Sequence, residues 1–85
     1  MQKVKIYTTP YCPYCIEAKR FLSQNNIPFE DFDVSNDQEL RQKVSAENGH
    51  YRTVPMILVG DVFVGGYTEL IQQAKSGNLE KLLED

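Results

Sequence analysis

The run Cys12-Pro13-Tyr14-Cys15 stands where one structural pattern of the chain gives way to another. Before it, residues 3–8 alternate with a period of two, which predicts a short strand. After it, apolar residues recur at helical spacing. Proline is favoured at the first helical position, where its missing N–H would have no partner in any case. Pro13 therefore indicates that the helix begins at Cys12, and its end is expected at Asn25.

The two cysteines suit thiol–disulfide exchange, a reaction that needs a thiolate, although a free cysteine has a pKa of ~8.5. Unbonded N–H groups and the helix dipole stabilise an anion at a helix N-terminus, where Cys12 is expected. Pro13, which opens the helix, and Lys19, one turn beyond Cys15, are expected to help stabilise the thiolate. Cys15 falls on the apolar side of the helix, so we expect Cys12 to be the exposed nucleophile and Cys15 the resolving thiol. Their spacing allows a redox-active disulfide to close with little backbone movement.

Two other uses of the cysteine pair fit the sequence less well. A structural disulfide across a two-residue gap would remove little chain entropy, and it would be unstable in a reducing compartment. A mononuclear zinc site needs four ligands, whereas the chain offers Cys12, Cys15 and the lone His50. The sequence therefore predicts a catalytic pair and no metal site.

The next part of the chain repeats the order of strand and helix. Residues 29–34 predict a second strand. Ser35, followed three residues later by Gln38, is typical of a capping box at the start of a second helix. A strand, a helix and a second strand in this order predict a right-handed parallel crossover.

The last third of the chain predicts a hairpin and further helices. Residues 54–59 are apolar except for Pro55, which removes a ladder donor and so belongs at the beginning of this strand. Gly60 and Asp61 predict a tight turn into a strand at 62–64. Thr68 is expected to cap a third helix, and a short helix follows Gly77. The predicted fold is α/β, in the order βαβα then ββα, with one mixed four-stranded sheet and helices on both faces.

Composition limits the classes of protein to which the chain can belong. At 85 residues it is expected to form a single domain over residues 1–85. The net charge is −3 and no basic run is present, so nucleic-acid binding is not expected. No apolar stretch reaches the ~20 residues that span a bilayer, and no signal-peptide core is seen, so we expect a cytoplasmic protein away from membranes. A monomer is expected.

Three runs taken together resemble a known family. Cys12-Pro13-Tyr14-Cys15, Thr53-Val54-Pro55 and Gly65-Gly66-Tyr67 occur in the order and at the spacing found in bacterial dithiol glutaredoxins, which have the thioredoxin fold. The resemblance extends along nearly the whole chain and implies a glutathione-dependent thiol–disulfide oxidoreductase. Such an enzyme reduces protein disulfides and glutathionylated proteins, with glutathione as its co-substrate.

The resemblance also implies a glutathione groove. Pro55 matches the cis-proline of the family, and Val54 would pair through its main chain with the cysteine of glutathione. The start of the third helix would receive the γ-glutamyl carboxylate through backbone N–H groups. The residues expected to bind glutathione are Tyr14, Thr53, Val54, Pro55, Gly66, Tyr67 and Thr68.

The chain departs from the family at two positions. Thr9 stands where many members have a lysine that pairs with the glycine carboxylate of glutathione. Thr68 stands where many have an aspartate near the γ-glutamyl amino group. Arg52 and Gln38 are the nearest replacements for the missing cation. Each lost charge-assisted bond would weaken glutathione binding by on the order of 1 kcal/mol.

Two other functions stay open at this point. One is a redoxin that is reduced by a thioredoxin reductase and donates electrons to ribonucleotide reductase. The Thr9 and Thr68 departures slightly favour this function, whereas the runs Thr53-Val54-Pro55 and Gly65-Gly66-Tyr67 argue against it. The other is an iron–sulfur cluster carrier, in which Cys12 from two subunits and glutathione hold the cluster. Family members that carry clusters mostly have glycine, phenylalanine and serine after the first cysteine, so Pro13 and Cys15 argue against this function.

Overall fold

A four-stranded sheet runs through the centre of the protein, in the order β2-β1-β3-β4. The structure is a computed structural model and describes residues 1–84. The strands are β1 (Val4–Thr8), β2 (Phe29–Asp33), β3 (Met56–Val59) and β4 (Val62–Gly65). β1 and β2 are parallel, whereas β1–β3 and β3–β4 are antiparallel pairs. This confirms the predicted mixed sheet.

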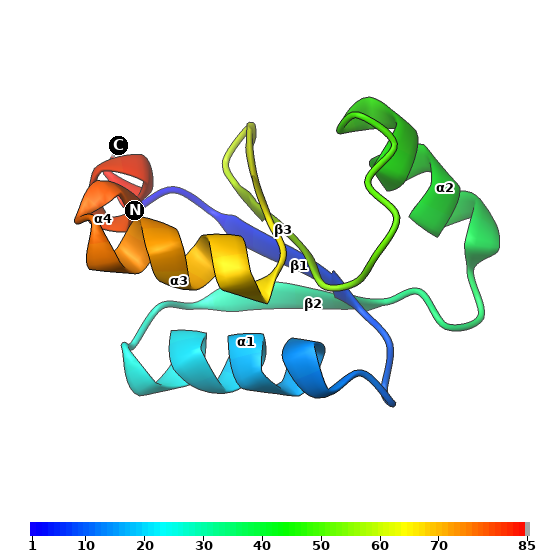
Figure 1. Cartoon of the computed structure of the whole chain (residues 1–85), viewed down its shortest axis with the longest axis horizontal. Coiled ribbons are helices and arrows are strands. Elements are labelled where there is room, and N and C mark those ends of the chain that lie inside the picture. Colours follow the sequence, from blue (N-terminus) through cyan, green and yellow to red (C-terminus); the bar gives the residue numbers. More distant parts are fainter. Residues whose placement is uncertain (85) are drawn as a thin grey trace.

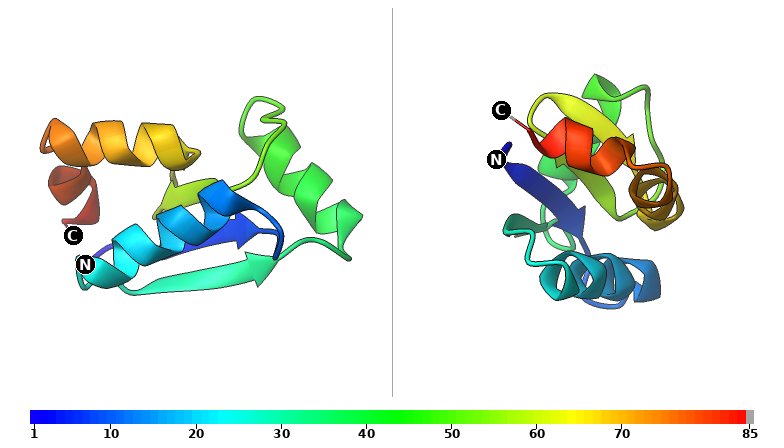
Figure 2. Two further views of the ribbon diagram at one scale, coloured as in Figure 1. Left: turned by 60° about the horizontal axis from the view of Figure 1, so that its bottom comes forward. Right: turned by 90° about the vertical axis from the view of Figure 1, so that its left-hand side faces the viewer.

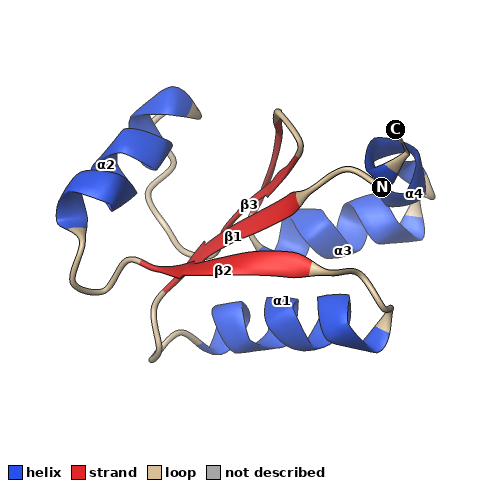
Figure 3. Cartoon of the chain, turned by 180° about the vertical axis from the view of Figure 1, so that it is seen from behind, coloured by secondary structure: helices blue, strands red, loops and turns tan. Residues whose placement is uncertain are grey.

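The helices are α1 (Pro13–Gln24), α2 (Gln38–Glu47), α3 (Tyr67–Lys75) and α4 (Asn78–Leu83). Figure 1 and the end-on view of Figure 2 show α1 and α3 on one side of the sheet and α2 on the other. The view from behind in Figure 3 shows the two termini together at one end of the molecule, beside α4. Helices therefore cover both faces, as predicted.

One end of the sheet brings distant segments together. Because β1 and β3 are antiparallel, the end of β1 lies beside the start of β3, with Tyr7 opposite Met56. The end of β4 also lies there, with Gly65 opposite Ile57. Figure 1 shows that α1 and α3 both begin at this end, away from the termini. The Cys12 segment, the Val54 segment and the start of α3 must therefore meet.

The turn between β3 and β4 requires a glycine. Gly60 has a φ of 58°, a conformation that residues with a Cβ rarely adopt. A Cβ at this position would meet only the flexible end of the Gln2 side chain, so the φ angle is what favours glycine here. The predicted turn at Gly60 is confirmed.

The main core lies between the sheet and the three helices α1, α3 and α4. Its buried members are Val4, Ile6, Ala18, Leu22, Ile27, Ile57, Val59, Leu70, Leu79 and Leu83. They come from alternate positions of β1 and β3, from one stripe of each of these helices, and from Ile27 in the loop before β2. This core holds α1 and α3, and hence their first turns, against the sheet.

The predicted start of α2 was wrong in its details. Asp37, not Ser35, caps the helix, because its side chain accepts a hydrogen bond from the N–H of Leu40 at 3.0 Å. The N–H of Ser35 instead donates to the carboxylate of Asp33 at 2.9 Å. An ionised aspartate is a strong N-cap acceptor, and it displaces the serine from that role.

The buried stripe of α1 predicts a stability difference between two positions of the same helix. Leu22 is completely buried, whereas Ile16 is 46% exposed. Leu22→Ala should lower the free energy of unfolding by about 2–5 kcal/mol, because it opens a cavity in the core. Ile16→Ala should change it by less than about 1 kcal/mol. Urea unfolding followed by circular dichroism measures both, and equal losses would contradict this assignment of the core.

Candidate active site

Cys12 caps the N-terminus of α1, as predicted. Its backbone is extended, Pro13 occupies the first helical position, and its sulfur accepts a hydrogen bond from the N–H of Cys15 at 3.1 Å. The N–H of Ile16 is bonded to the carbonyl of Cys12 at 3.1 Å, which starts the helical ladder. One of the unbonded N–H groups of the first turn therefore points at the sulfur, where it stabilises negative charge.

Cys15 lies one turn further on and is completely buried. The pKa of the Cys15 thiol is raised to about 12, mainly by burial and to a smaller extent by the hydrogen bond with Cys12. Cys12 is half-buried, and both thiols are free. The two sulfurs therefore differ in access to solvent, with Cys12 the one that an incoming disulfide can reach.

Lys19 has a partner that the sequence did not predict. Its ammonium group lies 2.9 Å from the carboxylate of Asp31 on β2. The other oxygen of that carboxylate accepts a hydrogen bond from the hydroxyl of Thr8, which is buried, at 2.6 Å. Lys19 lowers the pKa of Cys15, although less strongly than burial raises it. Stabilisation of the Cys12 thiolate by Lys19 stays a prediction.

The segment before β3 lies directly against the sulfur of Cys12. The Val54–Pro55 peptide bond is cis, which agrees with the resemblance. The sulfur of Cys12 lies 3.5 Å from the carbonyl oxygen of Val54, to which the thiol donates a hydrogen bond. Any extended ligand that pairs with the main chain of Val54 would therefore lie next to the sulfur.

A cavity of about 350 Å³ opens beside this contact. All seven residues that the resemblance assigns to glutathione binding line it: Tyr14, Thr53, Val54, Pro55, Gly66, Tyr67 and Thr68. The rings of Tyr14 and Tyr67 stack across it, with centroids 6.2 Å apart. We call this cavity the groove. Its lining comes from three separate parts of the chain that the sheet topology brings together.

Two lining residues of the groove, Tyr51 and Glu69, were not predicted as site residues. Oε1 of Glu69 accepts hydrogen bonds from the N–H of Gly66 at 2.8 Å and from the hydroxyl of Tyr51 at 2.9 Å. These two bonds, the first more strongly, hold the pKa of the Glu69 carboxyl below its ordinary value. Glu69 is thus a fixed negative charge in the groove.

The cap of α3 corrects the role predicted for Thr68. Gly66 is the N-cap residue, and Thr68 lies inside the first turn with an exposed side chain. The N–H of Gly66 is satisfied by Glu69, which is three residues further along the chain. A glutamate three residues after a possible cap is the signal that could have found this arrangement.

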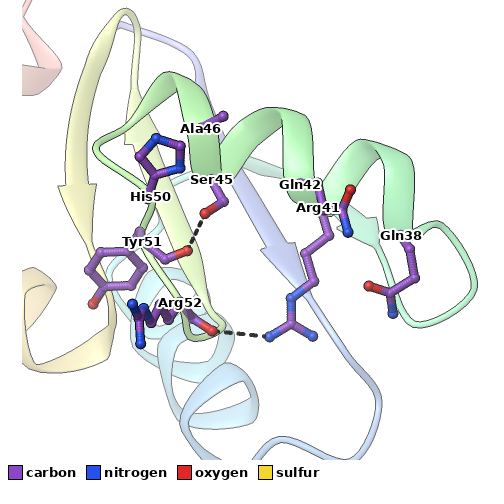
Figure 4. Close-up of a pocket in the computed structure, with 8 residues that line it drawn as sticks. All are labelled: Gln38, Arg41, Gln42, Ser45, Ala46, His50, Tyr51 and Arg52. Carbon is purple, nitrogen blue, oxygen red and sulfur yellow. Dashed lines mark hydrogen bonds between the residues drawn. The ribbon is translucent and has the colours of Figure 1, made fainter.

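A second cavity, of about 440 Å³, lies between α2 and the segment that leads to β3. Its lining residues are Gln38, Arg41, Gln42, Ser45, Ala46, His50, Tyr51 and Arg52. Figure 4 shows the guanidinium of Arg41 directed at the carbonyl of Arg52, to which it donates at 3.4 Å, and Ser45 bonded to the carbonyl of Tyr51. We call it the arginine cavity. Both residues that were predicted to replace the missing lysine, Gln38 and Arg52, line this cavity. Arg41, which was not predicted, lines it as well.

Within residues 1–84, no group of three or more His, Cys, Asp or Glu side chains is placed to hold a metal ion. None of the helices in that part of the chain is long and apolar enough to cross a bilayer.

The fold and the site together define a class of protein. A Cys-x-x-Cys pair opens a helix that follows the first strand of a mixed sheet, with the first thiol at the helix N-terminus and the second thiol buried. This is the arrangement of thiol–disulfide oxidoreductases with the thioredoxin fold.

The comparisons identify the family. A model of the glutaredoxin family matches residues 4–64. Glutaredoxin 1 of Rickettsia felis is 41% identical over 85 residues, which cover 99% of this chain and 83% of that protein. Glutaredoxin of Pseudomonas aeruginosa is 39% identical, with 98% of each chain covered. The solution structure of Brucella melitensis glutaredoxin has a TM-score of 0.84 at 40% identity and covers 98% of this chain and 89% of that one. The chain belongs to the glutaredoxin family and is a thiol–disulfide oxidoreductase.

The contacts of Glu69 predict a pH-dependent contribution to stability. Because its folded pKa is lowered, this contribution is present above the carboxyl's unfolded pKa and is lost as the pH falls through the folded value. Glu69→Gln should therefore lower the free energy of unfolding by about 1 kcal/mol at neutral pH. The difference from the unmodified protein should shrink in acid, below the ordinary carboxyl value of 4.5.

Urea unfolding across the acidic range measures this effect. Glu47→Gln is a matched control, because it removes the same charge from an exposed position on α2. A Glu69→Gln variant as stable as the unmodified protein at neutral pH would contradict the role given to these hydrogen bonds.

Proposed function

We propose that the chain is a glutathione-dependent oxidoreductase that reduces protein disulfides and glutathionylated proteins in the cytoplasm. The observation that carries this proposal is the groove beside the Cys12 sulfur, which gathers all seven residues expected to bind glutathione. A buckwheat glutaredoxin that shares the fold, at 20% identity and a TM-score of 0.87, has been solved as a complex with glutathione and aligns with 94% of this chain and 74% of its own.

Reduction of a protein disulfide uses both cysteines. The Cys12 thiolate attacks one substrate sulfur, a mixed disulfide forms on Cys12, and the second substrate sulfur leaves as a thiolate that takes up a proton. Cys15 then loses its proton and attacks the Cys12 sulfur, which closes the Cys12–Cys15 disulfide and releases the substrate sulfur that was bonded to Cys12, which takes up a proton. Burial of Cys15, which lies one turn from Cys12, protects it from outside disulfides while keeping it close to the bond it must break.

Glutathione restores the dithiol in the second half of the cycle. One glutathione thiolate attacks the Cys12–Cys15 disulfide, forms a mixed disulfide on Cys12 and releases Cys15. A second glutathione attacks the sulfur of the bound glutathione, so that oxidised glutathione leaves and Cys12 is free again. Removal of glutathione from a glutathionylated protein passes through the same mixed disulfide and needs only Cys12.

The groove and the arginine cavity together suit the three parts of glutathione. Its cysteine would pair with the main chain of Val54 next to the Cys12 sulfur. Its γ-glutamyl end would lie at the start of α3, where the groove is lined by Tyr67 and Thr68. Its glycine carboxylate would reach toward Arg52 in the arginine cavity, which supplies the cation absent at Thr9.

A coupled assay tests this function. Reduction of a glutathionylated peptide should proceed with glutathione, glutathione reductase and NADPH, because the groove holds glutathione against Cys12. It should be much slower when thioredoxin reductase is the electron source. Cys12→Ser is the control and should be inactive with either source. Faster turnover with thioredoxin reductase would replace the proposal with the redoxin function, in which ribonucleotide reductase is a candidate partner.

A further inference from the structure

The groove and the arginine cavity share one lining residue, Tyr51. Its hydroxyl donates to Glu69 on the groove side, and its carbonyl accepts from Ser45 on the side of the arginine cavity, as Figure 4 shows for the second contact. Its ring packs edge-on against Phe63, with centroids 5.1 Å apart. Tyr51 is therefore held at three points between two sites of different charge.

The charges on the two sides of Tyr51 are opposite. The groove contains the carboxylate of Glu69, fixed by Gly66 and Tyr51. The arginine cavity contains Arg41 and Arg52, and none of the described residues that line it is acidic. Of the charged side chains that line the two cavities, a carboxylate therefore lies toward the start of α3 and two guanidinium groups lie toward α2.

The main chain at Val54 determines which way a bound peptide runs. A peptide residue that exchanges both of its backbone hydrogen bonds with one residue of a strand must run antiparallel to that strand. The protein chain passes from Arg52 through Val54 to Pro55, and the carbonyl of Pro55 approaches Gly66 at the start of α3. A substrate cysteine paired with Val54 would therefore have its preceding residues toward Glu69 and its following residues toward Arg52.

We propose that this charge polarity selects protein substrates in which the reacting cysteine follows a basic residue and precedes an acidic one. The proposal rests on the proposed thiol exchange at Cys12 and on main-chain pairing at Val54. A basic side chain before the cysteine would lie toward Glu69, and an acidic side chain after it would lie toward Arg41 and Arg52. The reverse order places like charges together at both ends, so it is disfavoured twice.

Two peptides with the same composition test the proposal. Each is a capped pentapeptide with glycine at both ends, one with the central order lysine-cysteine-glutamate and the other with glutamate-cysteine-lysine. Both are supplied as symmetrical disulfides, so that either sulfur presents the same sequence to Cys12. Pre-reduced protein is mixed with each in stopped flow under single-turnover conditions. Two electrons pass from the Cys12–Cys15 dithiol to the peptide disulfide, and no glutathione is needed.

The lysine-cysteine-glutamate peptide should be reduced roughly tenfold faster, the size expected for a few partly exposed charge pairs of either sign. Each rate is divided by the rate with dithiothreitol, which removes the intrinsic reactivity of the two disulfides. The preference should largely disappear in ~1 M salt, where the screening length falls to about 3 Å. Equal normalised rates at low salt, or a preference that salt leaves unchanged, would overturn the proposal.

Substitutions locate the source of the preference. Arg52→Gln and Arg41→Gln should each reduce the ratio of the two rates by about two- to threefold, because each removes a cation from the arginine cavity. Lys43→Gln is the matched control, since it removes the same charge from an exposed position of α2 outside that cavity, and it should leave the ratio unchanged. An equal effect of Lys43→Gln would show that only net charge matters and would overturn the proposal.

The same experiment separates this proposal from the function on which it rests. If both peptides are reduced at equal normalised rates, thiol exchange at Cys12 stands and the charge selection is wrong. If neither peptide is reduced, the proposed reduction of disulfides fails, and the charge selection fails with it.

Discussion

The sulfur of Cys12 caps the first turn of α1 and lies at the positive end of that helix. It accepts the N–H of Cys15 at 3.1 Å, and so takes the place that a serine or aspartate oxygen takes in an ordinary N-cap. The same contact places the Cys12 sulfur at the positive end of the helix dipole. Pro13 supports this arrangement because it sits at the first helical position without needing a hydrogen-bond partner. The helix therefore begins at the residue that must carry negative charge during the reaction.

The sheet topology brings the remaining parts of the site to this sulfur. Antiparallel pairing of β1 with β3 places the Val54–Pro55 segment next to the loop that leads to Cys12. Pairing of β3 with β4 brings the start of α3 to the same end of the sheet. The core beneath α1 and α3 fixes both helices, so the groove between their first turns is formed by the same packing that stabilises the fold. Function and stability thus depend on one set of contacts.

Periodicity and turn residues were sufficient to predict the order of elements, the mixed sheet, the place of Cys12 at the start of α1 and the burial of Cys15. The seven residues expected to form the groove line one cavity, although their binding of glutathione stays a prediction. The helix caps were harder to predict, because several nearby side-chain oxygens can accept the unbonded N–H groups at a helix start. Which of them does so depends on local geometry that the sequence alone does not specify. Asp37, and not the predicted Ser35, caps α2. At the start of α3 the side chain that completes the cap is Glu69, and not the predicted Thr68. Arg41 and Tyr51 were missed because the site is assembled from segments far apart in the chain.

Cys15 is buried and its pKa is raised to about 12, so Cys12 is expected to be the reactive member of the pair. Brief alkylation of the reduced protein with iodoacetamide at neutral pH, followed by mass spectrometry of its peptides, measures the two thiols separately. Cys12 should be modified rapidly, and Cys15 should be modified only after denaturation. Modification of both cysteines at similar rates in the folded protein would contradict the account.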